Sequence, residues 1–462
     1  MIRRNLLEIQ KMVNGKGLPD NLQNDVVIGV STDSREIVSE QLFIPIIGDT
    51  FNGHDFIEDA FRNGAKAALW NAAIPLPNID IPLIFVEDTL LALQNLAREY
   101  VNQLKTKIIG ITGSNGKTST KDILHGILKA KYRTHKTLGN YNNELGVPLT
   151  LLSMNEDTEV AVIEMGMSAL GDIALLCSIA KPDIAIITNS TDVHINELGS
   201  VENILKAKLE IATGVKENGL LVYYGDSEHL KKGVDGINRN IIKQSFGENE
   251  DNQFVIKLIS TGDDGVYFRV INAESNVYHL PMLGKHQMYN GTAAIAVARH
   301  MQISANDIQK AMFELSVTGM RNEIVHADGF DILNDSYKSN PNSMRAALET
   351  LYSLKNYSQK ILVLGDMFGT GDNEIENHFQ IGKEIDPDKI DYIYTLGLLG
   401  EYFGKGAATN FKECRIASCQ SKEEILEGLK KVIQKDSIIL VKGSRIVKLE
   451  ELVEKLLTIH IS

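Results

Sequence analysis

Cysteine is scarce in this sequence of 462 residues, and basic residues are outnumbered by acidic ones. Its three cysteines, Cys177, Cys414 and Cys419, are sparse and odd in number, which fits a reducing compartment better than a disulfide framework. No second Cys/His pair accompanies Cys414 and Cys419, so a metal site there is disfavoured. The formal net charge of −13 argues against a general nucleic-acid or anionic-membrane binder, while a local basic pocket stays open.

Long apolar runs are also missing. No stretch approaches the length of a membrane span, and the first residues mix charges where a secretion signal needs an apolar run. We find neither an internal repeat nor a low-complexity tract. An apolar content of 43% and a charged content of 23% are ordinary for a globular protein. We therefore expect a globular protein of the cytoplasm.

The length predicts about three domains of roughly 150 residues each. Alternating strand-like and helix-like segments predict an α/β fold throughout. We expect a small N-terminal α/β domain at 1–100, a central P-loop-type domain at 101–316, and a Rossmann-like α/β domain at 317–462. The central sheet should be mostly parallel, with helices on both faces.

These expectations rest on short runs of residues that are apolar or that alternate between apolar and polar. The first domain has strand candidates at 25–31, 41–47 and 67–70, with a helix at 56–63. The central domain has buried-strand candidates at 107–111, 160–163, 184–188 and 220–224, a hairpin at 254–270, and an Ala-rich helix at 289–300. The third domain has strand candidates at 330–333, 360–364, 392–396 and 437–441.

The most informative segment follows the first central strand. Gly113–Thr118 is a glycine turn ending in Lys-Thr, and a helical pattern begins at Ser119. Inward-facing backbone N–H groups and a helix N-terminus favour phosphate, Lys117 can reach the outer phosphates, and Thr118 offers a hydroxyl to Mg²⁺. Ile111 stands where the general P-loop has glycine, so this is a shorter variant. The segment predicts binding of a nucleoside triphosphate.

Other polar residues leave the same sheet. Glu164 ends the second strand, at the edge where ligands of such sheets bind, and is placed to hold Mg²⁺. His194 follows the next strand, which makes it a better ligand candidate than an isolated histidine. Three further loops, at 284–290, 334–341 and 442–445, carry polar groups, although such loops alone usually just turn the chain.

The order of these segments resembles a family, the Mur ligases of peptidoglycan synthesis. The resemblance runs from about Val26 to Leu449. It rests on the following segments: Asp33–Arg35, Gly53–Phe56, Thr112–Thr118, Asn140–Pro148, Glu164–Gly166, His194, Ala207–Glu210, Gly284–His286, Asp335–Tyr337, Leu364–Met367 and Val441–Arg445. Two of them, Asn140–Asn143 and Leu364–Met367, look most like members that join D-alanyl-D-alanine to a UDP-N-acetylmuramoyl tripeptide.

The resemblance implies an ATP-dependent amide ligase with an acyl-phosphate intermediate, a third domain that closes on binding, and a monomer without nucleic-acid or membrane partners. Lys117, Glu164, His194 and Lys208 would be catalytic, with Lys208 matching a lysine that many members carbamylate. Thr118, Glu164 and His194 would hold Mg²⁺. ATP would contact Thr112, Gly113, Ser114, Asn115, Gly116, Lys117, Thr118, His286, Asn290, Arg321 and Asp335, and Lys285 would lie near it. Substrates would meet Ser34, Arg35, Asn142, Asn143, Lys338, Lys442, Ser444 and Arg445.

The sequence departs from the family pattern mainly in the third domain. The differing positions are Ser190–Thr191, Gln287, Lys338, Phe368–Gly371 and Ile446. Lys338 stands where an asparagine is usual, and could pair with a substrate carboxylate or point to solvent. A relative that accepts another amino acid or dipeptide is therefore an alternative. A non-catalytic nucleotide-binding regulator is disfavoured because Lys117, Glu164 and His194 are present. A transport or motor ATPase is disfavoured because no second nucleotide motif follows.

Overall fold

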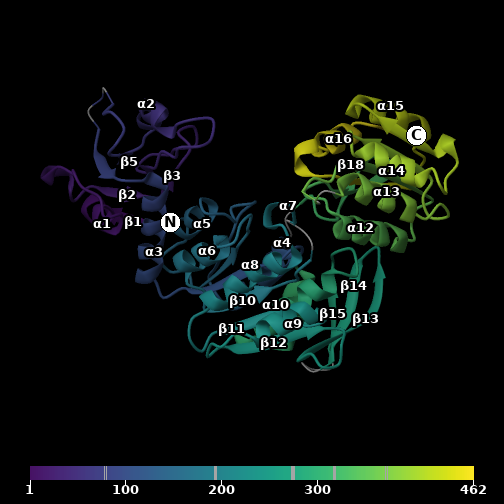
Figure 1. Ribbon diagram of the computed structural model, residues 1–462, viewed down its shortest axis with the longest axis horizontal. Helices are drawn as coiled ribbons and strands as arrows, with labels where there is room; N and C mark the ends of the chain where they lie inside the picture. The colour runs from purple at the N-terminus through teal and green to yellow at the C-terminus, as the bar shows by residue number, and fades with distance from the viewer. Residues whose placement is uncertain are drawn as a thin grey trace.

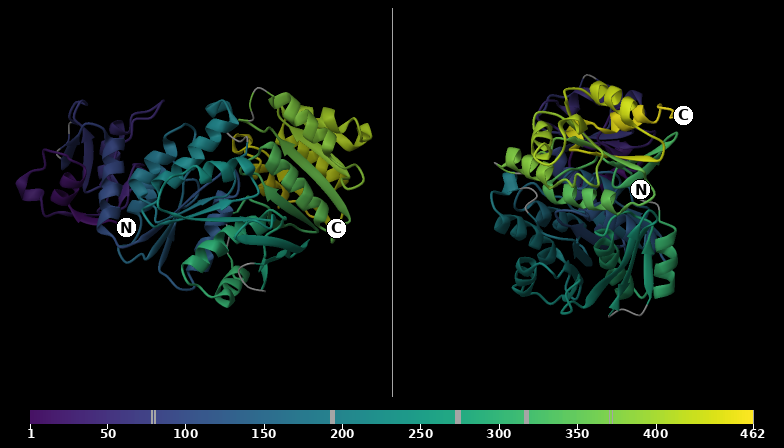
Figure 2. Two further views of the ribbon diagram at one scale, coloured as in Figure 1. Left: turned by 60° about the horizontal axis from the view of Figure 1, so that its bottom comes forward. Right: turned by 90° about the vertical axis from the view of Figure 1, so that its right-hand side faces the viewer.

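Sheets covered by helices organise the chain into three parts that follow one another along the sequence and lie in a row (Figure 1). The computed structural model describes residues 1–77, 79, 81–191, 195–271, 276–315, 319–369, 371 and 373–461. Figure 2 shows the central part between the other two, with the chain ends on opposite sides of the molecule. The α/β fold with three domains is confirmed. The boundaries at residues 100 and 316 stay predictions.

The first part holds a small parallel sheet of order β3-β4-β5-β6 and an antiparallel pair, β1-β2. The predicted strand at 25–31 is wrong as one element, because Gly29, with φ +83°, divides it between the two sheets. Of the run 41–47 only two residues form a strand. The elements are β1 (Arg3–Asn5), α1 (Leu6–Met12), β2 (Val26–Ile28), β3 (Val30–Ser31), β4 (Leu42–Phe43), α2 (Ile57–Arg62), β5 (Ala67–Asn71), β6 (Leu83–Val86) and α3 (Thr89–Gln103).

The central part is built on a sheet of order β15-β14-β13-β12-β11-β10-β7-β9-β8, in which neighbouring strands from β8 to β13 pair parallel and β14 pairs antiparallel with both β13 and β15. The predicted buried strands and the hairpin are confirmed, whereas β8, β12 and β15 were not predicted. The elements are β7 (Lys107–Thr112), α4 (Lys117–Leu128), β8 (Thr134–Lys136), α5 (Gly146–Leu152), β9 (Val160–Glu164), α6 (Asp172–Ala180), β10 (Ile184–Ile187), α7 (Ile195–Leu198), α8 (Val201–Gly214), β11 (Leu220–Tyr224), α9 (Glu228–Asp235), β12 (Ile242–Gly247), β13 (Phe254–Gly262), β14 (Gly265–Val270), β15 (Val277–Leu280), α10 (Gln287–His300) and α11 (Ala305–Phe313).

Helices cover both faces of this sheet, as predicted. Successive residues of a buried strand point to opposite faces, so both faces are apolar and each packs into its own core. Ile109 of β7 packs with α4 and α10 on one face, while Ile108 packs with α5 and α6 on the other. The second core continues without a break into the first part, where it includes Leu6 of α1 and Leu93 of α3. The first two parts therefore share one hydrophobic core.

The third part has a sheet of order β16-β17-β21-β18-β19-β20, in which only β16 is antiparallel within the described residues. The predicted strands are confirmed, and β16 and β20 were not predicted. Its cores lie on the two faces of this sheet and consist almost wholly of its own residues. The elements are β16 (Glu323–His326), β17 (Phe330–Asp335), α12 (Pro341–Ser353), β18 (Gln359–Gly365), α13 (Glu374–Glu384), β19 (Tyr392–Leu396), α14 (Gly400–Ala407), β20 (Ile416–Cys419), α15 (Lys422–Val432), β21 (Ser437–Lys442) and α16 (Glu450–Leu456).

Candidate functional site

The glycine turn lies between the end of β7 and the start of α4, which begins at Lys117, two residues earlier than predicted. Gly113 and Gly116 have φ of +147° and +81°, conformations that L side chains rarely adopt. A Cβ at Gly113 would lie 1.9 Å from Thr188 Oγ1, and one at Gly116 would lie 2.3 Å from Asn290 Oδ1. Both positions therefore require glycine for conformation and for space.

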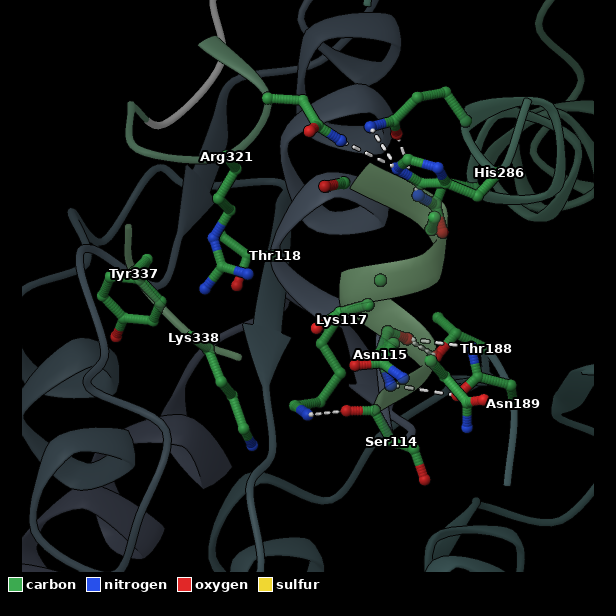
Figure 3. Close-up of a pocket in the computed structure, with 18 of the residues that line it drawn as sticks. Ser114, Asn115, Lys117, Thr118, Thr188, Asn189, His286, Arg321, Tyr337 and Lys338 are labelled. Atoms are coloured by element: carbon green, nitrogen blue, oxygen red, sulfur yellow. Dashed lines mark hydrogen bonds between the residues drawn. The ribbon is translucent and has the colours of Figure 1, made fainter. Parts of the chain in front are cut away.

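A cavity of about 530 Å³ opens above this turn, between the central and third parts (Figure 3). It gathers side chains from elements far apart in sequence, including predicted residues of the turn and of the third part. Its lining consists of Ser114–Ser119, Asn140, Asn142, Glu164, Thr188, Asn189, Thr191, Tyr224, His286, Gln287, Tyr289, Asn290, Arg321, Asn322, Asp335, Tyr337, Lys338, Asn342, Ser343, Ala346 and Lys442. Thr112 and Gly113 line a second cavity instead.

Thr118 and Glu164 meet at the floor of the first cavity, where β9 ends beside α4. Thr118 Oγ1 donates to Glu164 Oε2 at 2.8 Å, and Asn142 Nδ2 donates to Glu164 Oε1 at 2.9 Å. Both Thr118 and Glu164 are buried. Among the described residues no group of three or more His, Cys, Asp or Glu side chains could hold a metal ion. His194 lies outside the described residues.

Lys117 folds back onto the turn, where its Nζ donates to Gly113 O at 2.6 Å. Burial lowers the pKa of Lys117 to about 7, with the positive charge of Lys338 as the next cause. Lys121, one helical turn further along α4, was not predicted as a site residue. Its side chain is buried, with Nζ 4.0 Å from Glu164 Oε2 and without a hydrogen-bond partner. Its i+4 spacing from Lys117 was the available sequence signal.

Residues after β10 hold the glycine turn in place, and none of them was predicted as a site residue. Thr188 Oγ1 donates to Asn115 O at 2.6 Å, and Asn189 Oδ1 accepts from Asn115 N at 2.9 Å. Ser114 Oγ donates to Thr191 O at 3.1 Å. The departures from the family pattern at residues 190 and 191 thus lie beside the turn itself.

Lys208 lies on α8 with 1% of its surface exposed, and its Nζ has no hydrogen-bond partner among the described residues. Burial lowers its pKa to about 7, aided by the positive charges of Lys117 and Lys338. A neutral amine is therefore accessible near neutral pH. That is the form in which an amine reacts with CO₂.

Polar side chains at the start of α10 form the far wall of the first cavity. Asn290 Nδ2 donates to Gln287 Oε1 at 2.9 Å, and Asn322 Nδ2 lies 3.2 Å from His286 Nε2. Burial lowers the pKa of His286 to about 4, so this imidazole is neutral at pH 7. Lys285 is not in the lining of the cavity and pairs with Glu248, its Nζ 3.0 Å from Oε1.

The third part contributes cationic side chains from β21, from the loop after β17 and from the segment before β16. Lys442, on the neighbouring β21, is buried and forms an ion pair with Asp335, and its Nζ donates to Lys338 O at 3.0 Å. The Arg321 guanidinium lies over the Tyr337 ring, 4.3 Å from its centroid. Figure 3 shows Arg321, Tyr337 and Lys338 on the side of the cavity opposite Thr188 and Asn189.

One side-chain hydrogen bond joins the third part directly to the glycine turn. Asn340 Nδ2 donates to Asn115 Oδ1 at 2.9 Å, across 225 residues of sequence. Asn340 is also the N-cap of α12, with its Oδ1 accepting from Ser343 N at 2.9 Å. Asn340 was not predicted as a site residue, because nothing in the sequence reveals which loops of two domains meet.

A second cavity, also of about 530 Å³, adjoins the first and shares Lys117, Asn142 and Lys338 with it. The predicted Asn143 lies here, with its Oδ1 accepting from Gly146 N at 2.9 Å. The second cavity is lined by Thr112, Gly113, Lys117, Asn142–Glu144, Gly166–Ala169, Asp172, Leu175, Leu176 and Lys338.

Besides Lys208, four predicted site residues among those described lie outside both linings. Arg35 is 86% exposed and pairs with Asp33 at 2.6 Å, which lowers the pKa of Asp33 to about 2. Its neighbour Ser34 is buried. Ser444 is buried, with its Oγ accepting from Phe368 N at 3.0 Å, and Arg445 lies 3.5 Å from Glu450 Oε1. The structure therefore does not bring these four together with the glycine turn.

Comparisons with known proteins cover almost the whole chain. Three family models match: Mur ligase family, catalytic domain, at residues 26–101; Mur ligase middle domain at 111–298; and Mur ligase, glutamate ligase domain, at 320–445. The UDP-N-acetylmuramoyl-tripeptide–D-alanyl-D-alanine ligase of Bacillus subtilis is 43% identical over 458 residues, 99% of each chain. The Escherichia coli ligase of the same name is 31% identical, again over 99% of each chain.

Solved structures agree with these relatives. A crystal structure of MurF from Acinetobacter baumannii superimposes with a TM-score of 0.89 at 28% identity, covering 99% of both chains. MurF ligase from Thermotoga maritima in complex with ADP has a TM-score of 0.80 at 29% identity, covering 93% of this chain and 96% of that one. The resemblance inferred from the motifs is confirmed, and this chain belongs to the Mur ligase family.

Proposed function

We propose that this chain is an ATP-dependent amide ligase that joins D-alanyl-D-alanine to UDP-N-acetylmuramoyl-tripeptide, releasing ADP and phosphate. The observation that carries the proposal is the pair of adjoining cavities that share Lys117, the lysine of the phosphate-binding turn. One cavity suits a nucleotide and the other a peptide end, so the two substrates can meet at one point. The Bacillus subtilis relative of that name, 43% identical over its full length, supports the choice of substrates.

The chemistry divides into two transfers. A carboxylate oxygen of the tripeptide bonds to the γ-phosphorus of ATP, and the bond from that phosphorus to ADP breaks with its electron pair on ADP. The dipeptide amine then bonds to the carbonyl carbon of the acyl phosphate, loses a proton, and phosphate departs with the C–O electron pair. Positioning and charge neutralisation carry such reactions, so few covalent roles fall to the protein.

In this proposal ATP occupies the first cavity. Its phosphates lie on the glycine turn, where backbone N–H groups and the N-terminus of α4 attract anions. Lys117 exchanges its contact with Gly113 O for a phosphate oxygen, and an anion there would restore the charged form that burial disfavours. His286, Asn290, Arg321 and Asp335 complete the nucleotide site, since all four line the same cavity.

The residues at the cavity floor fit a magnesium ion. A buried carboxylate and a buried hydroxyl face each other there, and both offer the oxygen ligands that Mg²⁺ prefers. We propose that Thr118 and Glu164 hold the ion and that His194 completes the set. Bound Mg²⁺ would neutralise charge that develops on the phosphates.

Lys208 is proposed to act as a carbamate. Its buried Nζ has no hydrogen-bond partner and a pKa of about 7, so the neutral amine can add to CO₂ and release a proton. The carbamate carries a negative charge beside the cations Lys117 and Lys338. Its formation removes the repulsion between these cations and the ammonium form of Lys208.

The remaining substrate contacts extend away from the cavities. We propose that Ser34 and Arg35 meet the UDP group, that Asn142 and Asn143 lie along the peptide, and that Lys338, Lys442, Ser444 and Arg445 act from the third part. We propose that the protein acts as a monomer. Among the described residues no helix is long and apolar enough to cross a membrane. We place the reaction in the cytoplasm, where ATP is made.

Phosphate release with UDP-N-acetylmuramoyl-tripeptide tests the proposal. We expect release to require both the tripeptide substrate and D-alanyl-D-alanine, and to be lost in Lys117→Ala. Release only with a different amine would refute the dipeptide assignment. Absence of release with every amine tried would refute the ligase function and favour a nucleotide-binding regulator.

A further inference from the structure

Among the described residues of the third part, Lys338 alone lines both cavities. It shares this position with Lys117 and Asn142 of the central part. Its side chain is solvent-accessible within the cavity, and Figure 3 shows it extending from the loop after Tyr337 on the side toward Lys117. The place where the two cavities adjoin is thus bordered by one lysine from each part.

The backbone at Lys338 is fixed from two sides. Buried Lys442 donates to Lys338 O at 3.0 Å while paired with Asp335. Two residues further on, Asn340 donates to Asn115 of the glycine turn at 2.9 Å. Because the backbone at Lys338 is anchored, its side chain can place the ammonium only within a limited volume. The loop therefore sets the position of this ammonium relative to the glycine turn.

The charged side chains around this point favour a bound anion. Lys117, Lys338 and Arg321 bring positive charge, while Glu164 and Glu197 are the carboxylates that act on Lys338. Lys117 and Lys338 bring like charges that repel each other. An anion between the lysines removes this repulsion. Where the cavities adjoin, the reaction needs a place for the phosphoryl group as it passes from ATP to the carboxylate.

We propose that Lys338 binds the phosphoryl group during its transfer, opposite Lys117, so that one ammonium from each part holds the reacting anion. This assignment rests on the proposed ligase function. The carboxylate oxygen gains the bond to phosphorus, ADP leaves with the electron pair, and Lys338 gives up no proton. A lysine serves here as a compact charge that forms hydrogen bonds in three directions. The role differs from binding the carboxylate of the incoming dipeptide.

The test compares Lys338→Met and Lys338→Arg with the wild type, and uses Lys412→Met, on the exposed surface of the third part, as the matched control. The first measurement is single-turnover formation of acyl phosphate from ATP and UDP-N-acetylmuramoyl-tripeptide without dipeptide, trapped by borohydride reduction. The second is the KM for D-alanyl-D-alanine at saturating ATP. Thermal unfolding and binding of ADP show whether each variant is folded.

We expect Lys338→Met to slow acyl-phosphate formation about 100-fold, as for other preorganised charges that act on a transition state. The KM for the dipeptide should stay within about twofold, Lys338→Arg should recover most of the rate, and Lys412→Met should match the wild type. Unchanged acyl-phosphate formation with a raised KM would overturn the proposal and assign Lys338 to the dipeptide. Unchanged values in both measurements would also overturn it. A wild type that forms no acyl phosphate would instead refute the ligase function.

Discussion

The hydrogen bond from Asn340 to Asn115 predicts that the third part stabilises bound nucleotide partly through an amide contact with the glycine turn. Asn115 belongs to the glycine turn, and its backbone is already held by Thr188 and Asn189. Its side chain is held by Asn340 at 2.9 Å. Removing this bond separates the third part from the glycine turn. It leaves in place every group of the third part that we propose to contact ATP.

The expected magnitude follows from the bond. A neutral side-chain hydrogen bond contributes about 0.5–1.5 kcal/mol net, which corresponds to about 2- to 10-fold in an equilibrium constant. Asn340 also caps α12, and losing a cap costs about 1 kcal/mol of stability. Asn340→Ser keeps a capping oxygen but is too short to reach Asn115, whereas Asn340→Ala loses both interactions. The serine variant therefore isolates the contact between the two parts.

The assay is a double-mutant cycle of Asn115→Ala and Asn340→Ser, read as the Kd for a non-hydrolysable ATP analogue. We expect each single variant to weaken binding about 2- to 10-fold, and the double variant to be no weaker than the worse single variant. Fully additive effects would refute the reasoning, because they would mean that the two amides act independently. Asn340→Ala should unfold at a lower temperature than Asn340→Ser, which checks the capping assignment separately.

Three further predictions concern the glycine turn, the proposed magnesium ligand Thr118 and the buried Lys208. Gly113→Ala should abolish ATP binding measured by calorimetry, because the new Cβ would lie 1.9 Å from Thr188 Oγ1 at a φ of +147°; binding at wild-type affinity would contradict this. Thr118→Ala should raise the Mg²⁺ concentration needed for half-maximal activity at least several-fold, and an unchanged Mg²⁺ titration would remove Thr118 from the ligand set. Activity in CO₂-free buffer should rise on adding bicarbonate, and the rise should be larger above the pKa of Lys208, which is about 7. At pH 8 about ten Lys208 amines are neutral for each charged one, and at pH 6 this ratio is inverted. Bicarbonate independence, with no carbamate signal in a ¹³C spectrum, would refute that role.

The sequence predicted those elements whose signal is local. The strand at 107–112 is a continuous apolar run followed by a turn that only glycine can form, so both its type and its end were readable. By contrast, β12 (Ile242–Gly247) mixes polar and apolar residues, and its place beside β11 depends on the sheet around it. The run at 25–31 looked like one strand because its pattern does not show that Gly29 turns the chain into a second sheet.

The candidate site followed the same rule. Thr118 and Glu164 were predictable partners because neighbouring parallel strands end at one edge of the sheet. The Asn340–Asn115 contact was not, because it depends on how two domains pack, which no local pattern encodes. Lys338 stood out only as a departure from the family pattern, and its place where two cavities adjoin needed coordinates.

The hydrophobic core shared by the first two parts has a consequence for how the molecule loses its structure. Residues of α1 and α3 pack into the same cluster as Ile108 and Leu151 of the central part, whereas the third part keeps cores of its own. Heat or denaturant should therefore melt the first two parts as one cooperative unit and the third as another. An N-terminal fragment cut after residue 100 would lack the central members of that cluster, among them Ile108 and Leu151. The N-terminal part is thus a region of a larger folding unit, and not a module that can be transplanted by itself.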